Sequence, residues 1–298
     1  MEPVRVKLVT RTGASPLGSW TYHEYRPTQL AGIVELAWYF DGPTVHRRKR
    51  VLPNGRVELL VNLGEPYRLI TGAGRERLDA AWVGGMLSRP QVFAQPPHQR
   101  VLGVRLHPVG AYALLARPMR ELSEQSVDLH DLVGRAAAEL AGRCHEATTV
   151  EARFRLVTAW VSERIARGRG ADESIVWVAS RIDRSAGAAS IAALRAETGL
   201  SRTRLVGAFR EQLGVAPKLY ARLVRFRRVL AMLQDGATPL ADVALAAGYY
   251  DQPHMNAEFR ALSGITPREF LAARHPVGDG STTGEPRGDG RLRAARTQ

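Results

Sequence analysis

The sequence predicts an α+β protein that has a β-rich N-terminal domain with a helical extension and an all-α C-terminal domain. Residues 1 to about 118 contain short β-type segments separated by turn-forming residues, and helical periodicity follows from about residue 129. An internal repeat lies near the C-terminal end, where the pattern F-R-x-x-x-G-V-A-P-x-x-Y at Phe209 returns as F-R-x-x-x-G-I-T-P-x-x-F at Phe259. Because every matched position is displaced by 50 residues (209 to 259), we expect two copies of one helical unit.

Composition excludes several classes of protein. The chain has 298 residues, of which 45% are hydrophobic, so it can build packed cores and a wholly disordered chain is excluded. No apolar run approaches the roughly 20 residues that span a bilayer, and the N-terminus lacks a secretory pattern. Cys144 is the only cysteine, which excludes a disulfide framework and favours a reducing, cytoplasmic location.

The N-terminal part is expected to be a small barrel or sandwich. Strand-like segments such as 57–62 and 101–106 are bounded by turn formers, and Pro53-Asn54-Gly55 predicts a tight turn. From about 129 to 168 the periodicity is helical, with Phe154 and Val157 on one apolar face. We predict an N-terminal domain over 1–168, ended by a Gly168-Arg169-Gly170 linker, a C-terminal domain over 172–275 and a disordered tail over 276–298.

The first repeated unit is expected to be a helix-turn-helix. Ser190 caps its first helix, Gly199 supplies the turn, and Ser201 caps a second helix that runs to about Gln212. Pro217 then begins a helix that reaches residue 234 and carries a regular apolar stripe.

The second unit repeats this plan with one change. Gly248 supplies its turn and Asp251 caps its second helix, which buries Met255 and Phe259. The turn glycines are separated by 49 residues (199 to 248) although the rest repeats at 50. We therefore expect the turn before the second of these helices to be one residue longer.

The repeat resembles the AraC/XylS family of transcription regulators over about 190 to 273. The residues that carry the resemblance are Ala244, Gly248-Tyr249, Asp251-Gln252, His254, Asn256, Phe259-Arg260, Gly264 and Thr266-Pro267. The resemblance implies two helix-turn-helix units joined by one long helix, with both recognition helices in successive major grooves of DNA. The position four residues before the turn glycine is normally small in the family. Ala244 obeys this rule, whereas the first unit has Arg195.

The N-terminal part resembles an uncharacterised cupin-like domain of the DUF6597 type, which precedes this DNA-binding module in a regulator subfamily. The matching segments are Tyr25-Arg26-Pro27, Trp38, Val51-Leu52-Pro53-Asn54-Gly55, Leu59-Leu60-Val61-Asn62 and 103–110. The resemblance implies a sensory or dimerising role.

Family DNA-facing positions map onto both recognition helices. In the second helix they are Gln252, His254 and Asn256, whose side chains can hydrogen-bond base edges. In the first helix they are Thr203, Val206 and Gly207, of which Thr203 alone can hydrogen-bond a base. Arg202 and Arg204 are better suited to phosphates, within a segment, Ser201 to Arg228, that holds eight Lys and Arg against Glu211 alone. These features predict that the second unit distinguishes bases while the first mainly binds phosphates.

Trp38, Arg56, Glu58 and Asn62 are candidates for a ligand pocket in the barrel, although core and strand surface explain them equally well. The histidines lack ligand spacing, so we expect no metal, and we expect no cofactor and no catalytic residues. The function expected is gated, sequence-specific binding of double-stranded promoter DNA by a monomer or homodimer, with an unidentified small-molecule effector and RNA polymerase as partners. The alternative is a small-molecule-binding protein or enzyme with a vestigial DNA-binding module.

Overall fold

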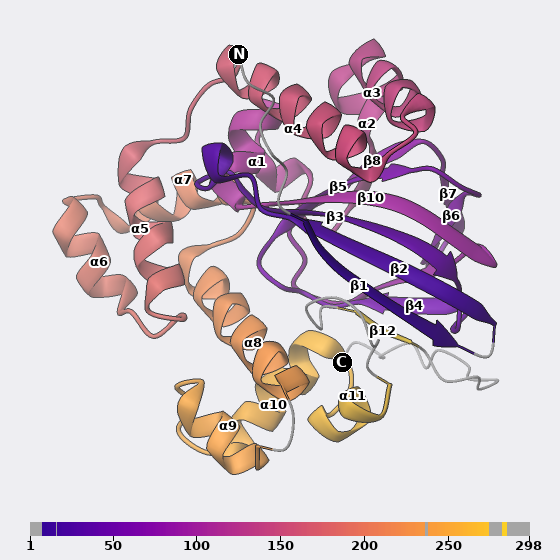
Figure 1. Cartoon of the computed structure of the whole chain (residues 1–298). Helices are drawn as coiled ribbons and strands as arrows, with labels where there is room; N and C mark the ends of the chain where they lie inside the picture. Colours follow the sequence, from indigo (N-terminus) through magenta and orange to yellow (C-terminus); the bar gives the residue numbers. More distant parts are fainter. Residues whose placement is uncertain (1–7, 16, 236–237, 274–281, 285–298) are drawn as a thin grey trace.

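The computed structural model describes residues 8–15, 17–235, 238–273 and 282–284, and it shows a two-sheet β structure joined to two groups of helices (Figure 1). The larger, antiparallel sheet has the strand order β1-β2-β3-β10-β5-β8-β11. Its strands are β1 (Leu8–Ser15), β2 (Gly18–Tyr25), β3 (Val34–Pro43), β10 (His98–Leu106), β5 (Val57–Asn62), β8 (Ala81–Gly84) and β11 (Ser126–Asp128).

The smaller sheet, also antiparallel, has the order β12-β4-β9-β6-β7. Its strands are β4 (Arg48–Val51), β6 (Tyr67–Thr71), β7 (Gly74–Leu78), β9 (Gln91–Ala94) and β12 (Thr282–Gly284). β12 falls within the predicted disordered tail and pairs with β4, whereas the rest of the tail lies outside the described residues.

Alternation along the strands divides the larger sheet into two buried faces. On one face, Leu59, Val83 and Val104 join the main core with the helices that follow the sheet. On the other, Leu60, Trp82 and Val101 pack in smaller clusters with residues such as Phe93 and Phe40. The sheet is thus covered on both sides, by helices and by the second sheet.

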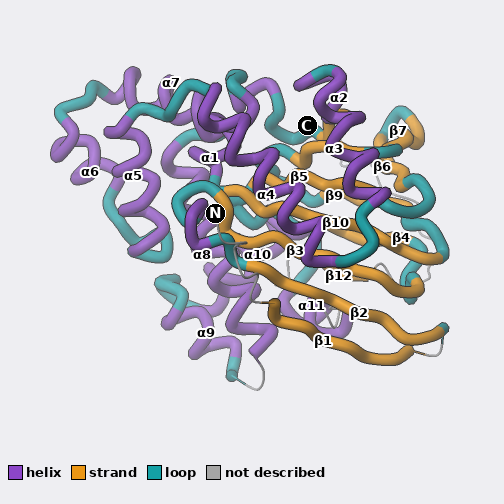
Figure 2. The backbone as a smooth tube through the Cα atoms, turned by 45° about the horizontal axis from the view of Figure 1, so that its top comes forward, coloured by secondary structure: helices purple, strands orange, loops and turns teal. Residues whose placement is uncertain are grey.

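The helical extension covers the first of these faces (Figure 2). It consists of α1 (Pro108–Leu115), the short 3-10 helix η2 (Met119–Glu121), α2 (Leu129–Val133), α3 (Arg135–Glu146) and α4 (Val150–Arg167). A further 3-10 turn, η1 (Thr28–Leu30), lies before β3. The predicted apolar face of α4 is confirmed, because Phe154, Val157 and Val161 are all fully buried.

The C-terminal helices form the second group. They are α5 (Glu173–Arg184), α6 (Ile191–Thr198), α7 (Arg202–Leu213), α8 (Pro217–Asp235), α9 (Leu240–Ala246), α10 (Gln252–Ser263) and α11 (Pro267–Ala273). Their core is organised around α8, whose Leu223, Phe226 and Leu230 are fully buried. The α+β class and the long connecting helix are confirmed. The predicted domain boundaries stay a prediction, since the C-terminal core also contains Leu52 and Met86 from the β-rich part.

Candidate functional site

The first recognition helix, α7, begins where the turn chemistry predicts. Gly199 adopts a left-handed conformation (φ +66°), and the Ser201 hydroxyl accepts a hydrogen bond from the backbone N–H of Arg204 at 3.2 Å. Leu205 and Phe209 are buried, and they fix the orientation of the helix.

The predicted DNA-facing residues of α7 lie mainly on its outer surface. Arg202, Thr203, Arg204 and Gly207 are exposed, and Val206 is half-buried. Residues 203, 206 and 207 share one face because they are spaced by three and four positions. A Cβ atom added to Gly207 would meet no atom within 4 Å, so this face is locally flat and open.

The second recognition helix, α10, is capped by Asp251, whose carboxylate accepts from the backbone N–H of His254 at 2.7 Å. It starts four residues after Gly248, whereas α7 starts three residues after Gly199, so the predicted longer turn is confirmed. His254 is exposed, while Gln252 and Asn256 are half-buried. The Oδ1 atom of Asn256 is buried and has no hydrogen-bond partner among the described residues. Bidentate pairing of Asn256 with adenine would therefore require this side chain to rotate.

Some arginines of the predicted basic surface form contacts within the protein. On α8, Arg222 donates to Glu258 at 2.9 Å and Arg225 lies 4.0 Å from the same carboxylate. Tyr249 donates its hydroxyl hydrogen to Glu258 at 2.8 Å, and the Arg225 guanidinium stands 5.4 Å above the Tyr249 ring. These contacts join α10 to α8. We expected the arginine-rich segment from Ser201 to Arg228 to face phosphate groups. That expectation is too broad, because several of these arginines form ion pairs within the protein.

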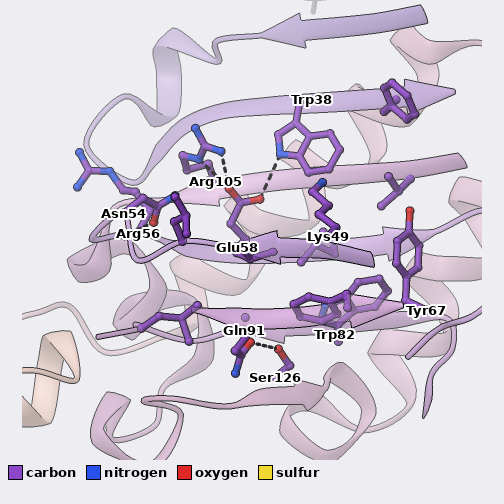
Figure 3. A pocket seen from close by; sticks show the side chains of 18 of the residues that line it. Trp38, Lys49, Asn54, Arg56, Glu58, Tyr67, Trp82, Gln91, Arg105 and Ser126 are labelled. Atoms are coloured by element: carbon purple, nitrogen blue, oxygen red, sulfur yellow. Dashed lines mark hydrogen bonds and ion pairs between the residues drawn. The ribbon is translucent and has the colours of Figure 1, made fainter. Parts of the chain in front are cut away.

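A cavity of about 140 Å³ lies between the two sheets (Figure 3). Its walls include six aromatic side chains, those of Tyr22, Trp38, Phe40, Tyr67, Trp82 and Phe93. The charged side chains that line it are Lys49, Arg56, Glu58 and Arg105. Glu58 accepts from the indole N–H of Trp38 at 3.2 Å and from Arg105 at 2.7 Å.

The structure brings together three of the four residues predicted for a pocket. Trp38, Arg56 and Glu58 line the cavity. Asn62 does not, and the prediction for it is wrong. Its side-chain amide donates to the backbone carbonyls of Glu65 and Asp79, each at 2.9 Å, and so it stabilises a loop.

Sequence reasoning missed Lys49, Trp82 and Arg105 as cavity residues. The available signal was strand alternation, since residues 82 and 84, or 58 and 60, face the same side of a strand. It was insufficient because the partner sheet, which encloses the cavity, could not be aligned with these strands from the sequence.

The segment Leu52 to Arg56 connects this cavity to the C-terminal helices. Every residue in it is buried. Leu52, Asn54 and Arg56 line the cavity, and Leu52 also packs in the C-terminal core. The predicted turn is confirmed by Gly55, with φ +70°, where an added Cβ would lie 3.4 Å from Leu223 of α8. We call this segment the docking loop.

A partly buried ionic cluster holds the docking loop against α5 and α8. Arg227 of α8 donates to the backbone carbonyl of Asn54 at 3.1 Å and to Asp183 of α5 at 2.8 Å. Arg56 lies 3.5 Å from Asp183 and is hydrogen-bonded to Glu35. Tyr220 donates to Asp183 at 2.7 Å.

Electrostatics keep both carboxylates of this cluster ionised. Burial alone would raise the pKa of Glu35, but the charges of Arg56 and Arg105 lower it to about 2. Burial likewise opposes the ionisation of Asp183, yet Arg56 and Arg227 hold its pKa below the usual value. The domain contact is therefore charged at neutral pH.

The N-terminal part also touches both helix-turn-helix units, in each case close to the C-terminal end of the recognition helix. Ser123 donates to the carbonyl of Gly214, which follows α7, at 2.7 Å. Arg50 donates to the carbonyl of Ser263, the residue before Gly264, at 3.2 Å. Arg120 of η2 additionally pairs with Glu211 of α7.

Metal binding, reaction at a cysteine thiol and membrane insertion find little support among the described residues. None of their His, Cys, Asp and Glu side chains form a group of three that could hold a metal ion. Burial raises the pKa of Cys144 to about 11, so its thiol is protonated at neutral pH. No described helix is both long enough and apolar enough to cross a membrane.

Two family models match separate parts of the chain. Residues 194–273 match the family model of a helix-turn-helix domain, and residues 23–128 match that of a domain of unknown function, DUF6597. A protein of Streptomyces antibioticus described as an AraC-like transcription regulator is 26% identical over 88 residues. That match covers 30% of this chain and only 28% of the relative.

Two solved structures are similar at low identity. ToxT from Vibrio cholerae is 12% identical with a TM-score of 0.48, and the match covers 79% of this chain and 98% of ToxT. The AraC-like transcriptional activator CuxR is 17% identical with a TM-score of 0.32, covering 77% of this chain and 88% of CuxR. The sequence resemblance is confirmed by the family matches: an AraC-type helix-turn-helix domain follows a domain of the DUF6597 type.

Proposed function

We propose that this protein is a transcription regulator that binds double-stranded DNA at preferred sequences through α7 and α10. The observation that carries the proposal is the pair of capped helix-turn-helix units on one central helix, within a segment that matches a helix-turn-helix family. Exposed Arg202 and Arg204 at the start of α7 suit phosphate contacts. On α10, exposed His254 and half-buried Gln252 and Asn256 carry groups that can hydrogen-bond base edges, which supports the proposal.

We further propose that occupancy of the N-terminal cavity controls this DNA binding. The docking loop supports the proposal, because its side chains form one wall of the cavity while its backbone accepts a hydrogen bond from Arg227 of α8. β4 adds a second connection. Lys49 and Val51 line the cavity, and the intervening Arg50 holds the end of α10. A molecule that displaces this wall would also displace the helices that hold both units.

The test of DNA binding is selection of bound duplexes from a random pool with the full chain. We expect enrichment of a sequence motif whose affinity falls steeply with salt concentration, as phosphate-binding proteins require. Recovery of a pool without sequence preference would contradict sequence-specific regulation. Contact with RNA polymerase, and the choice between a monomer and a homodimer, stay predictions from the sequence.

The coupling is tested with Arg227→Met, which removes the contacts of Arg227 with Asn54 and Asp183 and leaves the cavity lining intact. The measured quantity is DNA affinity in the presence and absence of cell extract that contains candidate effectors. We expect the response of the wild-type chain to be lost in the variant. The matched control is Arg228→Met, the next residue on α8, whose side chain is exposed. An equal response in Arg227→Met and wild type would rule out the docking loop as the connection.

A further inference from the structure

The outer face of the smaller sheet carries a concentration of arginines. Lys49 and Phe93 line the cavity, so strand alternation turns their neighbours toward the outside of the sheet. Residues opposite each other on paired strands point to the same side of a sheet, and the register therefore defines two rows across the outer face. One row is Arg48, Ala94, Arg68 and Arg77, and the next is Arg50, Val92, Ile70 and Arg75. We call these two rows the arginine face.

The arginine face has a strong excess of positive charge. Five of its members are arginines and none is acidic, whereas the whole chain has 42 Lys and Arg against 29 Asp and Glu. Arg77 is compensated by Asp79, which lies beside the face. No carboxylate among the described residues lies within ion-pair distance of Arg48, Arg68 or Arg75, and all three residues are exposed. These three guanidinium groups are therefore open to an external anion.

The shape of the arginine face suits the backbone of a nucleic-acid duplex. Neighbouring strands lie about 4.8 Å apart, so a row that crosses β4, β9, β6 and β7 is about 14 Å wide. A duplex carries one negative charge for about every 1.7 Å of its axis, so a segment of that length presents about eight charges. Arginine binds phosphate through paired N–H groups whichever base lies nearby. The rows therefore match a linear polyanion and do not distinguish its sequence.

Two other polyanionic partners fit the arginine face less well. Single-stranded nucleic acid is commonly held by stacking of its bases on aromatic side chains, and the face has no aromatic member. Proteins that lie on a membrane surface combine basic side chains with exposed apolar ones. The apolar members Val92, Ala94 and Ile70 are half-buried, and none of the described residues with a large exposed apolar side chain belongs to the face. A duplex is therefore the partner that these residues favour.

The arginine face adjoins the second recognition helix. Its member Arg50 donates to the carbonyl of Ser263, the last residue of α10, at 3.2 Å. A Cβ atom added to Gly264 would lie 3.4 Å from the guanidinium of Arg50 and 3.9 Å from Pro90. Figure 1 shows β4 next to β12, and β12 in turn contacts α11, the helix that follows α10. DNA that is held by α10 and extends beyond the contacted base pairs can therefore reach the face.

We propose that the arginine face binds the phosphate backbone of the duplex DNA that flanks the site held by α7 and α10. Arg48, Arg68 and Arg75 donate to phosphate oxygens, and Arg50 joins the face to the end of α10. The contact adds affinity without base preference. It rests on the proposed function, because α7 and α10 bring the flanking duplex to the face.

The test compares three duplexes that contain the same selected sequence, each bound to the full chain. Two recognition helices in successive grooves cover about 20 base pairs, so the shortest duplex has that length. The others add about 10 base pairs at one end or at the other, which is one further helical turn. Extension at one end only, the end beyond α10, should strengthen binding.

The measured quantity is the slope of log affinity against log salt. Neutralising three phosphates adds about 2.7 to this slope, so the advantage of the duplex extended beyond α10 should shrink roughly 40-fold between about 50 and 200 mM salt. Equal slopes for the three duplexes overturn the proposal. So does an equal rise for extension at either end, because that would be a general effect of length.

A triple variant identifies the groups responsible. It is Arg48→Gln/Arg68→Gln/Arg75→Gln. This variant should lose the added slope and keep the affinity of the wild type for the shortest duplex. Retention of the added slope overturns the proposal. Should the variant fail to fold, the comparison of the two extended duplexes with the wild type still decides the matter.

The matched control removes the same charge from the opposite side of the N-terminal part. Its three exposed arginines lie on α3 and α4, which cover the other face of the larger sheet. The control variant is Arg135→Gln/Arg143→Gln/Arg155→Gln. It should keep the added slope, and equal losses in the two triple variants would overturn the proposal, because they would reflect net charge alone.

Two further outcomes separate this proposal from its alternatives. Vesicles of phosphatidylglycerol test a lipid surface: binding to them that the first triple variant loses, with the added DNA slope unchanged, would overturn the proposal. Wild-type chain that binds the shortest duplex and gains nothing from either extension would contradict the arginine face and leave the proposed function intact. A chain that binds none of the duplexes would contradict both.

Discussion

The two helix-turn-helix units share their end signals and differ in what holds their recognition helices. Each recognition helix has a capping side chain at its start and a glycine with positive φ at its end. α7 packs against α1 and η2 of the N-terminal part, and Arg120 and Ser123 fasten its end. α10 is joined to α8 through Glu258, and Arg50 of the N-terminal part donates to the carbonyl of Ser263 at its end.

Because of this difference, the two recognition helices of one chain can respond differently to a movement of the N-terminal domain. The orientation of α10 is set mostly within the C-terminal domain, whereas that of α7 depends on the domain that contains the cavity. Movement of the N-terminal domain would then change the spacing of α7 relative to α10. DNA grooves recur at a fixed spacing, so such a change would alter affinity without altering either surface.

The largest expected difference between the two units is in the free energy of unfolding of variants at the position four residues before each turn glycine. Ala244 is fully buried where α9 packs against α10, while Arg195 at the corresponding place in the first unit is exposed. Ala244→Leu should lower the free energy of unfolding by about 3 kcal/mol, because it overpacks a close helix crossing. Arg195→Leu should change it by less than about 0.5 kcal/mol. Urea denaturation of both variants checks this, and equal losses would mean that the units are packed alike.

The second prediction concerns the ion pairs. Glu258→Gln removes the charged partner of Arg222 and weakens the bond from Tyr249, so the free energy of unfolding should fall by about 2 kcal/mol. The ion pair compared with it in the first unit is removed by Glu211→Gln, and the side chain of its partner Arg120 is 54% exposed. A surface pair of that kind contributes about 0.5 kcal/mol or less. The same denaturation measurement applies, and a larger loss for Glu211→Gln would reverse the comparison.

The third prediction separates base contacts from phosphate contacts. Gln252→Ala should reduce discrimination at one base pair by about 1–2 kcal/mol, because an amide that pairs with a base is lost. Arg202→Ala should weaken binding to all sequences alike and lower the slope of log affinity against log salt by about 1. Fluorescence anisotropy with a selected site and its single-base variants measures both quantities. The division of roles fails if Arg202→Ala changes discrimination and Gln252→Ala changes only the slope.

The smallest expected effect is at Gly207 on the open face of α7. Gly207→Ala should stabilise the protein by about 0.5–1 kcal/mol, since alanine restricts the unfolded chain and fits an open helix position. Its thermal midpoint should rise while DNA discrimination is kept. A fall in stability would contradict the prediction, because it would mean that the added methyl group meets another atom.

Local chemistry explains what could be predicted from the sequence. The caps Ser190, Ser201 and Asp251 and the turn at Gly199 act within a few residues, so their roles were recognisable and are confirmed. The burial of Phe209 and Phe259 followed from helical spacing.

The remaining features depend on contacts between distant segments. Pro53-Asn54-Gly55 predicted a turn correctly, but nothing near it in sequence indicates that it contacts Arg227 and Leu223. Likewise, nothing in the sequence near Glu258 indicates that it pairs with Arg222 and not with another arginine. Asn62 was misassigned because its carbonyl partners at Glu65 and Asp79 are set by the path of a loop.

The most direct measurement of the central claim is parallel selection from one random duplex pool with three chains. These are the wild type, Gln252→Ala/Asn256→Ala and Arg202→Ala/Arg204→Ala. We predict that the wild type selects a motif, that the first variant loses the conserved bases contacted by α10, and that the second selects the same motif at lower affinity. The account is contradicted if the wild type selects no motif, or if the arginine variant loses the motif while the Gln252 and Asn256 variant keeps it.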